Sequence, residues 1–505
     1  MAGAEGNLVK GKSLGKVSSK FLAIDLGAES GRAFVGILDS GKISIEEIHR
    51  FPNVPVIVSG HLHWDVYGLF NHVRTALKLA VEKGHGDIIS VGVDTWGVDF
   101  GLVKSDGTPM EMPFTYRDSR TNGMMEKVFE KIPRGKLYSK TGIQLMQINS
   151  IFQLYSMKEE CSESLESADK LLFTPDIFNY FLTGRRVSEY TIASTSQLLN
   201  ASTRLFDEEI FLALGLPVKL MCPIVMPGTI VGSVIPEVAS GAGLRDVNVV
   251  AVGSHDTSSA VAAIPASGNN WAFLSSGTWS LIGVETDKPI INEKSLANNF
   301  TNEGGVGGKI TFLQNISGLW LLQELRRIWK ERGENYRYDE LVAMAREARE
   351  FKCILDPSDD SFLNPPDMET AIVDFCRKTD QASPENKGEF VKTVFESLAL
   401  KYRSAVRNLG AITGRKIEKL HIVGGGAQNE MLNQFTADAA GIPVVAGPVE
   451  ATVLGNIMVQ AIAENKIDSL EKGRDIVRQS FQVKEYVPRD SRKWDEAGGR
   501  VSFNF

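Results

Sequence analysis

The sequence predicts an α/β protein of two domains that enclose a cleft. With 505 residues, the chain is longer than a single hydrophobic core usually serves, so packing favours two large domains. Apolar strands alternate with segments of helical periodicity, which is typical of sheets flanked by helices. A Pro- and Gly-rich stretch at residues 223–247 interrupts this alternation, which then starts again.

Composition excludes several classes of protein. Hydrophobic residues make up 43% of the chain and charged residues 23%, as in soluble globular proteins. The net charge of -7 argues against a nucleic-acid partner. No run of about 18 apolar residues and no apolar signal core occur, so we expect no membrane partner and a cytoplasmic location. The four cysteines have no CxxC spacing, which favours free thiols.

We expect residues 1–19 to form a disordered N-terminal tail. Within it, the residues from Gly6 to Ser13 match the phosphate-binding pattern GxxxxGK[ST]. A working loop of this kind lies between a buried strand and a helix, and the sequence indicates neither of them here. We therefore interpret the match as chance.

The first domain is expected to span residues 20–247. Its start predicts a meander of strands rather than a strand that leads into a helix, because apolar runs follow one another across short turns. After a helix and a long strand, the sequence is rich in helical patterns up to about residue 220. The predicted strands are 20–27, 32–39, 42–51 and 88–103, and the predicted helix is 65–84.

The second domain is expected to span residues 248–485, followed by a C-terminal tail at 486–505. It repeats the α/β alternation of the first domain. The predicted strands are 247–253, the pair within 271–286 and 419–426, and the predicted helices lie near 317–350, 387–409 and 428–441.

Two strand-turn-strand segments are similar and indicate an internal duplication. They are AIDLGAESGRAFVG and FLSSGTWSLIGVE, in which Asp25, Gly27 and Ser30 correspond to Ser275, Gly277 and Ser280. Such hairpins could face each other across a cleft. The alternative is a pair of ordinary glycine-containing turns.

These two turns offer what phosphoryl transfer from a nucleotide requires. The turn from Gly27 to Arg32 exposes successive N–H groups, and Asp25 ends a buried strand where an isolated charge would be costly. The turn at 275–278 adds further N–H and hydroxyl donors. Gly424 to Gly426 would let a ring or phosphate approach the backbone, or they form only a tight strand-to-helix turn.

Three other polar segments leave alternatives open. Asp94 and Asp99 lie on one strand, where they either approach a ligand or make hydrogen bonds in turns. His61 and His63 would share one side of a strand, but no third metal ligand is near them in the sequence. Residues 115–123 (TYRDSRTNG) form either a surface ion-pair turn or a lip of the cleft.

The segment GSHDTSSA at residues 253–260 places Asp256 in a setting of small residues after an apolar strand. Asp256 and Thr257 are good residues for the start of a helix. Small neighbours would also let a substrate reach a buried carboxylate. The segment alone does not decide between these roles, which are compatible.

Eight motifs together resemble the FGGY carbohydrate kinases, and in particular the rhamnulokinase branch. They are AIDLGAESGR, VDTWGVDF, YRDSRTNG, SHDTSSA, LSSGTWSL, NISGLWLLQ, VGGGAQN and AGPVEATVLGN, and the resemblance covers residues 20 to about 485. It implies the actin/Hsp70/hexokinase-type fold. We therefore expect two actin-like ATPase domains, with ribonuclease H-like sheets flanked by helices, and an interdomain cleft.

The resemblance also implies roles for single residues. The general base would be Asp256 of the HDT motif, and Asp25 would hold a metal through water. The expected ATP contacts are Ala28, Glu29, Ser30, Gly31, Arg32, Thr278, Gln323 and Gly425. The expected sugar contacts are Gly97, His255, Asp256, Thr257 and Asn315.

The activity that the resemblance implies is transfer of the γ-phosphate of ATP to the 1-hydroxyl of L-rhamnulose, with Mg²⁺. The products would be L-rhamnulose 1-phosphate and ADP, in L-rhamnose catabolism. Alternatives are a kinase for a related ketose such as L-fuculose, or a non-catalytic nucleotide or sugar sensor on the same fold. We expect a monomer or a small homo-oligomer, and no disulfide at Cys376 because no partner lies at the family's spacing downstream.

Overall fold

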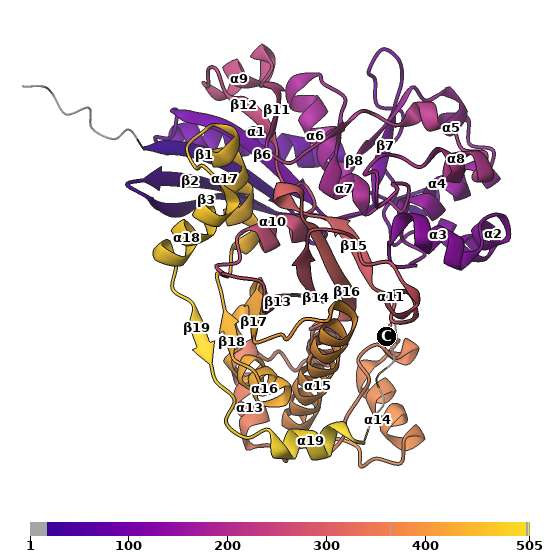
Figure 1. Cartoon of the computed structure of the whole chain (residues 1–505), viewed down its shortest axis with the longest axis vertical. Coiled ribbons are helices and arrows are strands. Elements are labelled where there is room, and N and C mark those ends of the chain that lie inside the picture. Colours follow the sequence, from indigo (N-terminus) through magenta and orange to yellow (C-terminus); the bar gives the residue numbers. More distant parts are fainter. Residues whose placement is uncertain (1–17, 364, 501–502, 504–505) are drawn as a thin grey trace, which may run out of the picture.

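The computed structural model describes residues 18–363, 365–500 and 503, which form two large mixed sheets flanked by helices (Figure 1). The α/β prediction is therefore confirmed. The match to the phosphate-binding pattern at residues 6–13, interpreted above as chance, lies outside the described residues.

The first sheet has six strands and includes the predicted meander. Its strands are β1 (Ser19–Leu26), β2 (Ser30–Asp39), β3 (Lys42–Pro52), β6 (Ile88–Thr95), β11 (Thr229–Ser233) and β12 (Asn248–Ala251). Their order is β11-β12-β6-β1-β2-β3. β1, β2 and β3 are antiparallel neighbours, whereas β1, β6 and β12 run parallel to one another.

The second sheet has seven strands. They are β13 (Trp271–Ser276), β14 (Trp279–Thr286), β15 (Thr301–Gly304), β16 (Ile310–Ser317), β17 (Lys419–Val423), β18 (Val444–Ala446) and β19 (Lys484–Tyr486), in the order β15-β16-β14-β13-β17-β18-β19. β13 and β14 form a hairpin like β1 and β2, and β13, β17 and β18 run parallel like β1, β6 and β12. This repeated connectivity supports the predicted internal duplication.

The central strand β1 is buried on both faces of the first sheet, as its apolar side chains on both sides predict. Leu22, Ile24 and Leu26 pack on the helices α1 (Val66–Glu82), α6 (Thr174–Thr183) and α9 (Pro236–Ala242). Phe21 and Ala23 point to the opposite face, which α17 (Ala451–Ala463) and α18 (Leu470–Ser480) cover. The segment from α17 to α18, late in the chain, thus returns to cover the first sheet.

One hydrophobic core lies between the two sheets. In it, α17 and the short helix α10 (Asp256–Ala262) pack against Phe21 of β1 and Phe273 of β13. The strand β12, which comes just before α10, pairs with β6 in the first sheet, so the expected domain boundary after residue 247 precedes the last strand of that sheet.

The remaining helices form two groups. Helices α2 to α5, α7 and α8 build the helix-rich part of the first domain, and α11 to α16 and α19 belong to the second. The expected tail at 486–505 contains α19, where Trp494 is buried. The bounds are α2 (Met124–Lys131), α3 (Arg134–Thr141), α4 (Ser150–Glu159), α5 (Glu163–Ser167), α7 (Tyr190–Ser194), α8 (Glu208–Leu214), α11 (Glu293–Ala297), α12 (Trp320–Glu331), α13 (Tyr338–Glu347), α14 (Met368–Lys378), α15 (Lys387–Thr413), α16 (Glu430–Ala440) and α19 (Arg492–Gly498).

Short elements complete the fold. They are β4 (Val56–Val58), β5 (His61–His63), β7 (Phe100–Val103), β8 (Lys170–Phe173), β9 (Ser188–Glu189), β10 (Ile224–Val225), η1 (Ser119–Thr121), η2 (Val218–Leu220), η3 (Val306–Gly308), η4 (Asp360–Phe362) and η5 (Gly425–Gln428).

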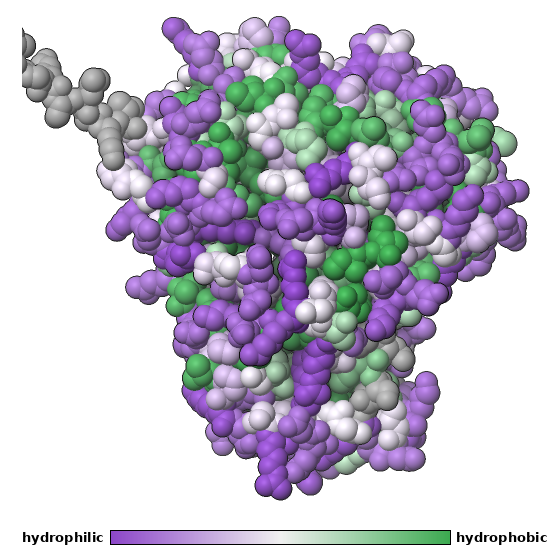
Figure 2. Space-filling view, in the orientation of Figure 1, coloured by the Kyte–Doolittle hydropathy of each residue, from purple (hydrophilic) through white to green (hydrophobic). Residues whose placement is uncertain are grey.

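Hydrophilic side chains cover most of the face seen in Figure 2, with hydrophobic residues in smaller groups among them. Among the described residues, no helix combines the length and the apolar character needed to cross a membrane.

Candidate active site

A cavity of about 360 Å³ opens between the two domains. Eight of the residues expected to bind substrates line it: Ala28, Gly97, His255, Asp256, Thr257, Thr278, Asn315 and Gly425. They come from both halves of the chain, so the fold gathers residues that are up to about four hundred positions apart in the sequence.

The turn between β1 and β2 reaches the cavity through Ala28. Its shape is fixed by the Gly27 N–H, which donates to the Ser30 carbonyl at 3.0 Å. The buried Asn53 holds the turn with two hydrogen bonds. Its side-chain amide donates to the Gly27 carbonyl at 2.9 Å, and its backbone N–H donates to the Glu29 carbonyl at 3.0 Å. Sequence reasoning missed Asn53, which lies in no recognisable motif.

Asp25 and Arg32 lie opposite each other in the hairpin and form an ion pair. Arg32 also contacts Glu450 at 2.5 Å, which ties the turn to the segment before α17. Burial raises the pKa of Asp25, the Arg32 guanidinium opposes this rise, and the nearby carboxylate of Asp256 adds to it. Asp25, Glu29, Ser30, Gly31 and Arg32 do not themselves line the cavity, although they surround Ala28.

Asp94 is the strand partner of Asp25 across β1 and β6. Asn456 of α17 donates to Asp94 Oδ2 at 2.6 Å, and Asp94 Oδ1 has no hydrogen-bond partner among the described residues. Burial, followed by the charge of Asp25, raises the pKa of Asp94 well above its ordinary value. The carboxyl ends of β1 and β6 therefore place two carboxylates side by side.

The turn between β13 and β14 faces the first turn across the cavity with Ser275, Ser276, Gly277 and Thr278. The Gly277 N–H donates to the Trp279 carbonyl at 2.9 Å, and the Gly277 carbonyl accepts from the Leu319 N–H at 3.0 Å. Gln323 lies on α12, which begins at this contact, and it does not line the cavity.

The triple glycine packs against this second turn. A side chain at Gly426 would collide with Ser276 Oγ at 2.0 Å, and Gly424 has a φ of +81°. The close approach of the backbone to Ser276 thus explains two of the three glycines, while Gly425 remains open to the cavity.

The strand predicted over residues 88–103 is broken at residues 96–99, between β6 and β7. Val98 has a φ of +68°, which is rare for a β-branched residue. Its N–H donates to Thr195 Oγ1 at 3.1 Å instead of to a neighbouring strand, while its carbonyl accepts from Ser150 Oγ. The break exposes Gly97 to the cavity beside Thr195 and His255.

Asp99 has a structural role. It accepts hydrogen bonds from the indole N–H groups of Trp64 at 2.6 Å and Trp96 at 2.9 Å, and further bonds from Tyr116 N and Gln153 Nε2. These bonds hold Trp96, which lines the cavity, in place. Of the two alternatives for Asp99, the structure shows the hydrogen-bonding one, while Gly97 of the same segment reaches the cavity.

Asp256 is the first residue of α10, and its side chain is 34% exposed. Its Oδ1 accepts from the Thr257 N–H at 2.6 Å and from Thr257 Oγ1 at 3.2 Å. Asp256 therefore starts a helix and also presents a carboxylate to the cavity. Burial raises the pKa of Asp256, and the charge of His255 opposes this rise.

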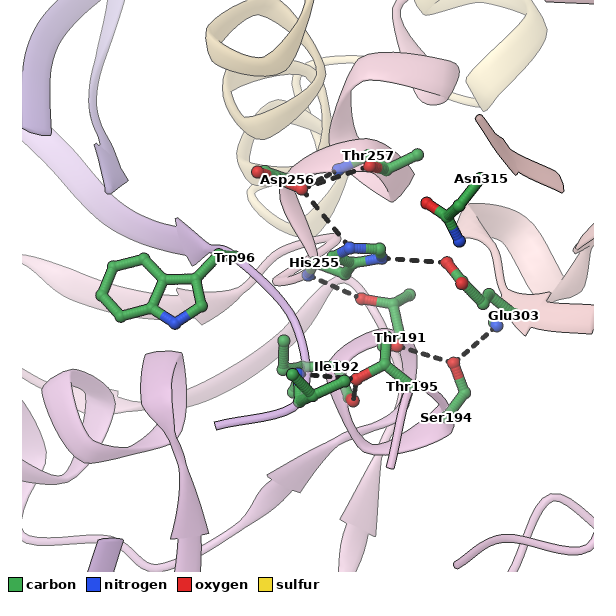
Figure 3. Close-up of polar contacts among 12 residues, drawn as sticks. Trp96, Thr191, Ile192, Ser194, Thr195, His255, Asp256, Thr257, Glu303 and Asn315 are labelled. Carbon is green, nitrogen blue, oxygen red and sulfur yellow. Dashed lines mark hydrogen bonds and ion pairs between the residues drawn. The ribbon is translucent and has the colours of Figure 1, made fainter. Parts of the chain in front are cut away.

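His255 lies between two carboxylates (Figure 3). Its Nε2 is 3.4 Å from Asp256 Oδ1, and its Nδ1 is 3.2 Å from Glu303 Oε2. Its backbone N–H donates to Thr191 Oγ1 at 3.1 Å, and that hydroxyl donates to the buried Glu189 at 2.6 Å. Sequence reasoning missed Glu189 and Glu303, because neither lies near a recognised motif.

Asn315 of β16 is held from the other domain. Its side-chain amide donates to Gln144 Oε1 at 2.9 Å, and Gln144 lies in the loop between α3 and α4. This hydrogen bond crosses the cavity and joins the two domains.

The histidine pair, the segment 115–123 and the cysteines, which the sequence also made candidates, do not form a further site. His61 contacts Asp118 at 3.1 Å and His63 contacts the Met112 carbonyl at 2.8 Å, and the described residues contain no group of three or more metal-binding side chains. Within residues 115–123, Tyr116 lines the cavity while Asp118 and Arg120 make internal bonds. All four cysteines are free thiols.

Two family models match the chain. The model of the N-terminal domain of the FGGY family of carbohydrate kinases matches residues 20–263, and that of the C-terminal domain matches residues 272–464. A protein of Bacteroides thetaiotaomicron named rhamnulokinase is 48% identical over 481 residues, which cover 95% of this chain and 98% of that protein.

The chain belongs to the FGGY family of carbohydrate kinases.

Other relatives place this FGGY kinase within one branch. A rhamnulokinase of Bacillus subtilis is 40% identical, with 93% of this chain and 96% of that protein covered.

Solved structures are more distant in sequence but share the fold. A gluconate kinase from Lactobacillus acidophilus has a TM-score of 0.80 at 17% identity, with 96% of both chains covered. A Plasmodium falciparum glycerol kinase with ADP has a TM-score of 0.78 at 15% identity, with 95% of this chain and 96% of that chain covered.

Proposed function

We propose that this FGGY kinase transfers the γ-phosphate of ATP to the 1-hydroxyl of L-rhamnulose, giving L-rhamnulose 1-phosphate and ADP in L-rhamnose catabolism. The rhamnulokinases of Bacteroides thetaiotaomicron and Bacillus subtilis, similar over nearly their whole length, support this substrate. The observation that carries the mechanism is the carboxylate of Asp256, exposed in a cavity that both glycine turns also reach.

Asp256 acts as the general base. Its carboxylate accepts the proton of the sugar hydroxyl while the hydroxyl oxygen attacks the γ-phosphorus and ADP leaves. The N–H groups of the two turns stabilise the charge on the phosphates, since they are fixed before the reaction starts. ATP contacts are assigned to Ala28, Glu29, Ser30, Gly31, Arg32, Thr278, Gln323 and Gly425.

The sugar lies on the side of the cavity formed by Gly97, His255, Thr257 and Asn315. The wall beside these residues is mainly apolar, with Trp96, Val98, Ile143, Met146 and Leu281. Such a wall suits the methyl group of a 6-deoxyketose such as L-rhamnulose. L-rhamnulose and L-fuculose differ only in the orientation of one hydroxyl group. L-fuculose is therefore the competing substrate to test.

Mg²⁺ is the proposed cofactor, with Asp25 as its protein partner through water. The donor set fits, because Mg²⁺ in kinases is held by one or two carboxylates, several waters and the substrate phosphates rather than by a full protein cage. Beside Asp25, Asp94 has a buried oxygen without a partner among the described residues, which adds to the negative charge at the carboxyl ends of β1 and β6. When bound, the ion neutralises phosphate charge during transfer.

We place the enzyme in the cytoplasm, where ATP is available, as a monomer or a small homo-oligomer.

The test is ADP release coupled to a reporter reaction, with Mg-ATP and a panel of L-rhamnulose, L-fuculose, L-xylulose, D-xylulose and glycerol. We expect L-rhamnulose to have the highest kcat/KM. The Asp256→Asn variant is expected to lower kcat by about 10²–10⁴, as for the loss of a general base.

The control is Asp287→Asn, which changes a carboxylate whose side chain is 80% exposed and pairs with Lys309. This variant should keep wild-type turnover. Full activity of Asp256→Asn, or no phosphorylation of any sugar while ATP still binds, would exclude the proposed function.

A further inference from the structure

The ring of His255 lies between two carboxylates, one at ion-pair distance from each of its two nitrogens (Figure 3). Asp256 lies on α10 and Glu303 on β15. A carboxylate can only accept hydrogen bonds, so each ring nitrogen is best satisfied if it carries a proton. The geometry therefore favours the doubly protonated imidazolium form of His255.

The backbone on both sides of Glu303 is held in place. All four residues of β15 are buried. The N–H of the next residue, Gly304, donates to Ser194 Oγ at 2.7 Å, and the N–H of the preceding residue, Asn302, donates to the Gly142 carbonyl at 2.9 Å. Both acceptors belong to the helix-rich part of the first domain, so the backbone on either side of Glu303 is anchored to that domain.

We propose that Glu303 is a positioning residue for the phosphoryl transfer: it holds His255 with Nε2 toward Asp256, as an imidazolium that keeps the base ionised. This proposal rests on the proposed function, in which Asp256 accepts the proton. Glu303 itself touches neither reacting atom and acts through His255.

The charges around the pair agree with this arrangement. Burial lowers the pKa of His255, but the Glu303 contact and the charges of Glu303, Asp256 and Glu189 outweigh burial, so the pKa is raised. For Asp256, burial raises the pKa and His255 is the charge that opposes it most. Asp25 and Asp94 lie at the ends of β1 and β6, and the negative charge of each interacts unfavourably with that of Asp256.

The experiment compares the pH dependence of kcat/KM for L-rhamnulose in the wild type and in Glu303→Gln. Without the carboxylate, His255 loses its proton at lower pH, and Asp256 loses the neighbouring positive charge. The acid limb of the profile should therefore move to higher pH by about 1 unit or more. The KM for ATP should stay unchanged, because Glu303 lies on the sugar side.

The matched control is Glu285→Gln. Glu285 is a similarly buried glutamate of the second sheet, where it pairs with Arg474 at 2.8 Å outside the cavity. Its replacement removes a buried carboxylate and an ion pair, and the acid limb should stay where the wild type has it. In a His255→Asn background, Glu303→Gln should shift the limb no further.

An unchanged acid limb in folded Glu303→Gln would overturn the proposal, as would an equal shift in the control. If Glu303→Gln does not fold, the ¹⁵N shifts of the ring nitrogens of His255 in the wild type decide the question, with His255→Asn identifying the signal. A doubly protonated ring at pH 7.5 supports the proposal and a neutral ring contradicts it. Full activity of Asp256→Asn would instead contradict the proposed function.

Discussion

At the scale of single residues, the number of donors around each carboxylate separates structural acids from reactive ones. Asp99 accepts bonds from two tryptophans, a backbone N–H and Gln153, so its lone pairs are occupied. Among the described residues, the hydrogen bonds that Asp256 accepts come from Thr257, and its side chain faces the cavity. A carboxylate must keep a free lone pair to accept a proton, which favours Asp256 as the base.

His421 predicts how stability depends on pH. It is buried in β17, and burial lowers its pKa to about 4, with Lys419 and Arg474 adding to the effect. The ordinary pKa of histidine is about 6.5, so the unfolded chain takes up a proton before the folded one does. Stability is therefore lost as the pH falls from about 6.5 toward 4.

We expect His421→Gln to remove this pH dependence. Between pH 7 and pH 5 the wild type should lose about 2 kcal/mol more of its free energy of unfolding than the variant does. Urea unfolding of both proteins at the two pH values measures the difference. Equal losses in both proteins would show that His421 is not protonated on unfolding.

At the scale of elements, the position of α10 decides where the base lies. α10 crosses α17 so closely that a side chain at Gly455 would meet the Ser259 carbonyl at 1.8 Å. A backbone atom at this distance cannot move aside without moving the helix. The contact thus determines the position of Asp256 relative to the first sheet.

Gly455→Ala should push α10 and α17 apart. We expect a loss of about 2 kcal/mol or more of stability, as for overpacking in a core, together with a lower kcat. Thermal unfolding and steady-state kinetics measure the two effects.

Gly135→Ala is the control, because Gly135 is also helical and has nothing within 4 Å of an added side chain. This change should leave stability unchanged or raise it by up to about 1 kcal/mol. A Gly455→Ala variant as stable and active as Gly135→Ala would show that the close crossing is dispensable.

At the scale of the whole molecule, two sheets of repeated connectivity face each other across one core and one cavity. The hydrogen bond between Gln144 and Asn315 is one of the polar contacts that join the cavity walls directly. Sugar and nucleotide would add contacts to both walls. Closure would also exclude water, which prevents hydrolysis of ATP.

We predict that the enzyme becomes more compact when both substrates bind. Small-angle scattering should show a smaller radius of gyration with L-rhamnulose and a non-hydrolysable ATP analogue than without ligands. ATP analogue alone should have a smaller effect. Identical scattering in all three samples would contradict closure.

The sequence by itself determined the elements and the candidate chemistry. Local patterns predicted the meander, the helix at 65–84 and the two similar turns, because hydrophobic periodicity and glycine turns are properties of neighbouring residues. The resemblance of eight short motifs supplied the family, which the comparisons confirmed.

Only the tertiary structure decided where strands break and which distant residues meet. The predicted strand at 88–103 is interrupted because Thr195 and Ser150 bind the backbone of Val98 in a rare conformation. Glu303 contacts His255 only because β15 lies against the first domain. Such contacts join residues far apart in the chain, and no local pattern encodes them, since their free energy arises only when the packed domains bring the partners together.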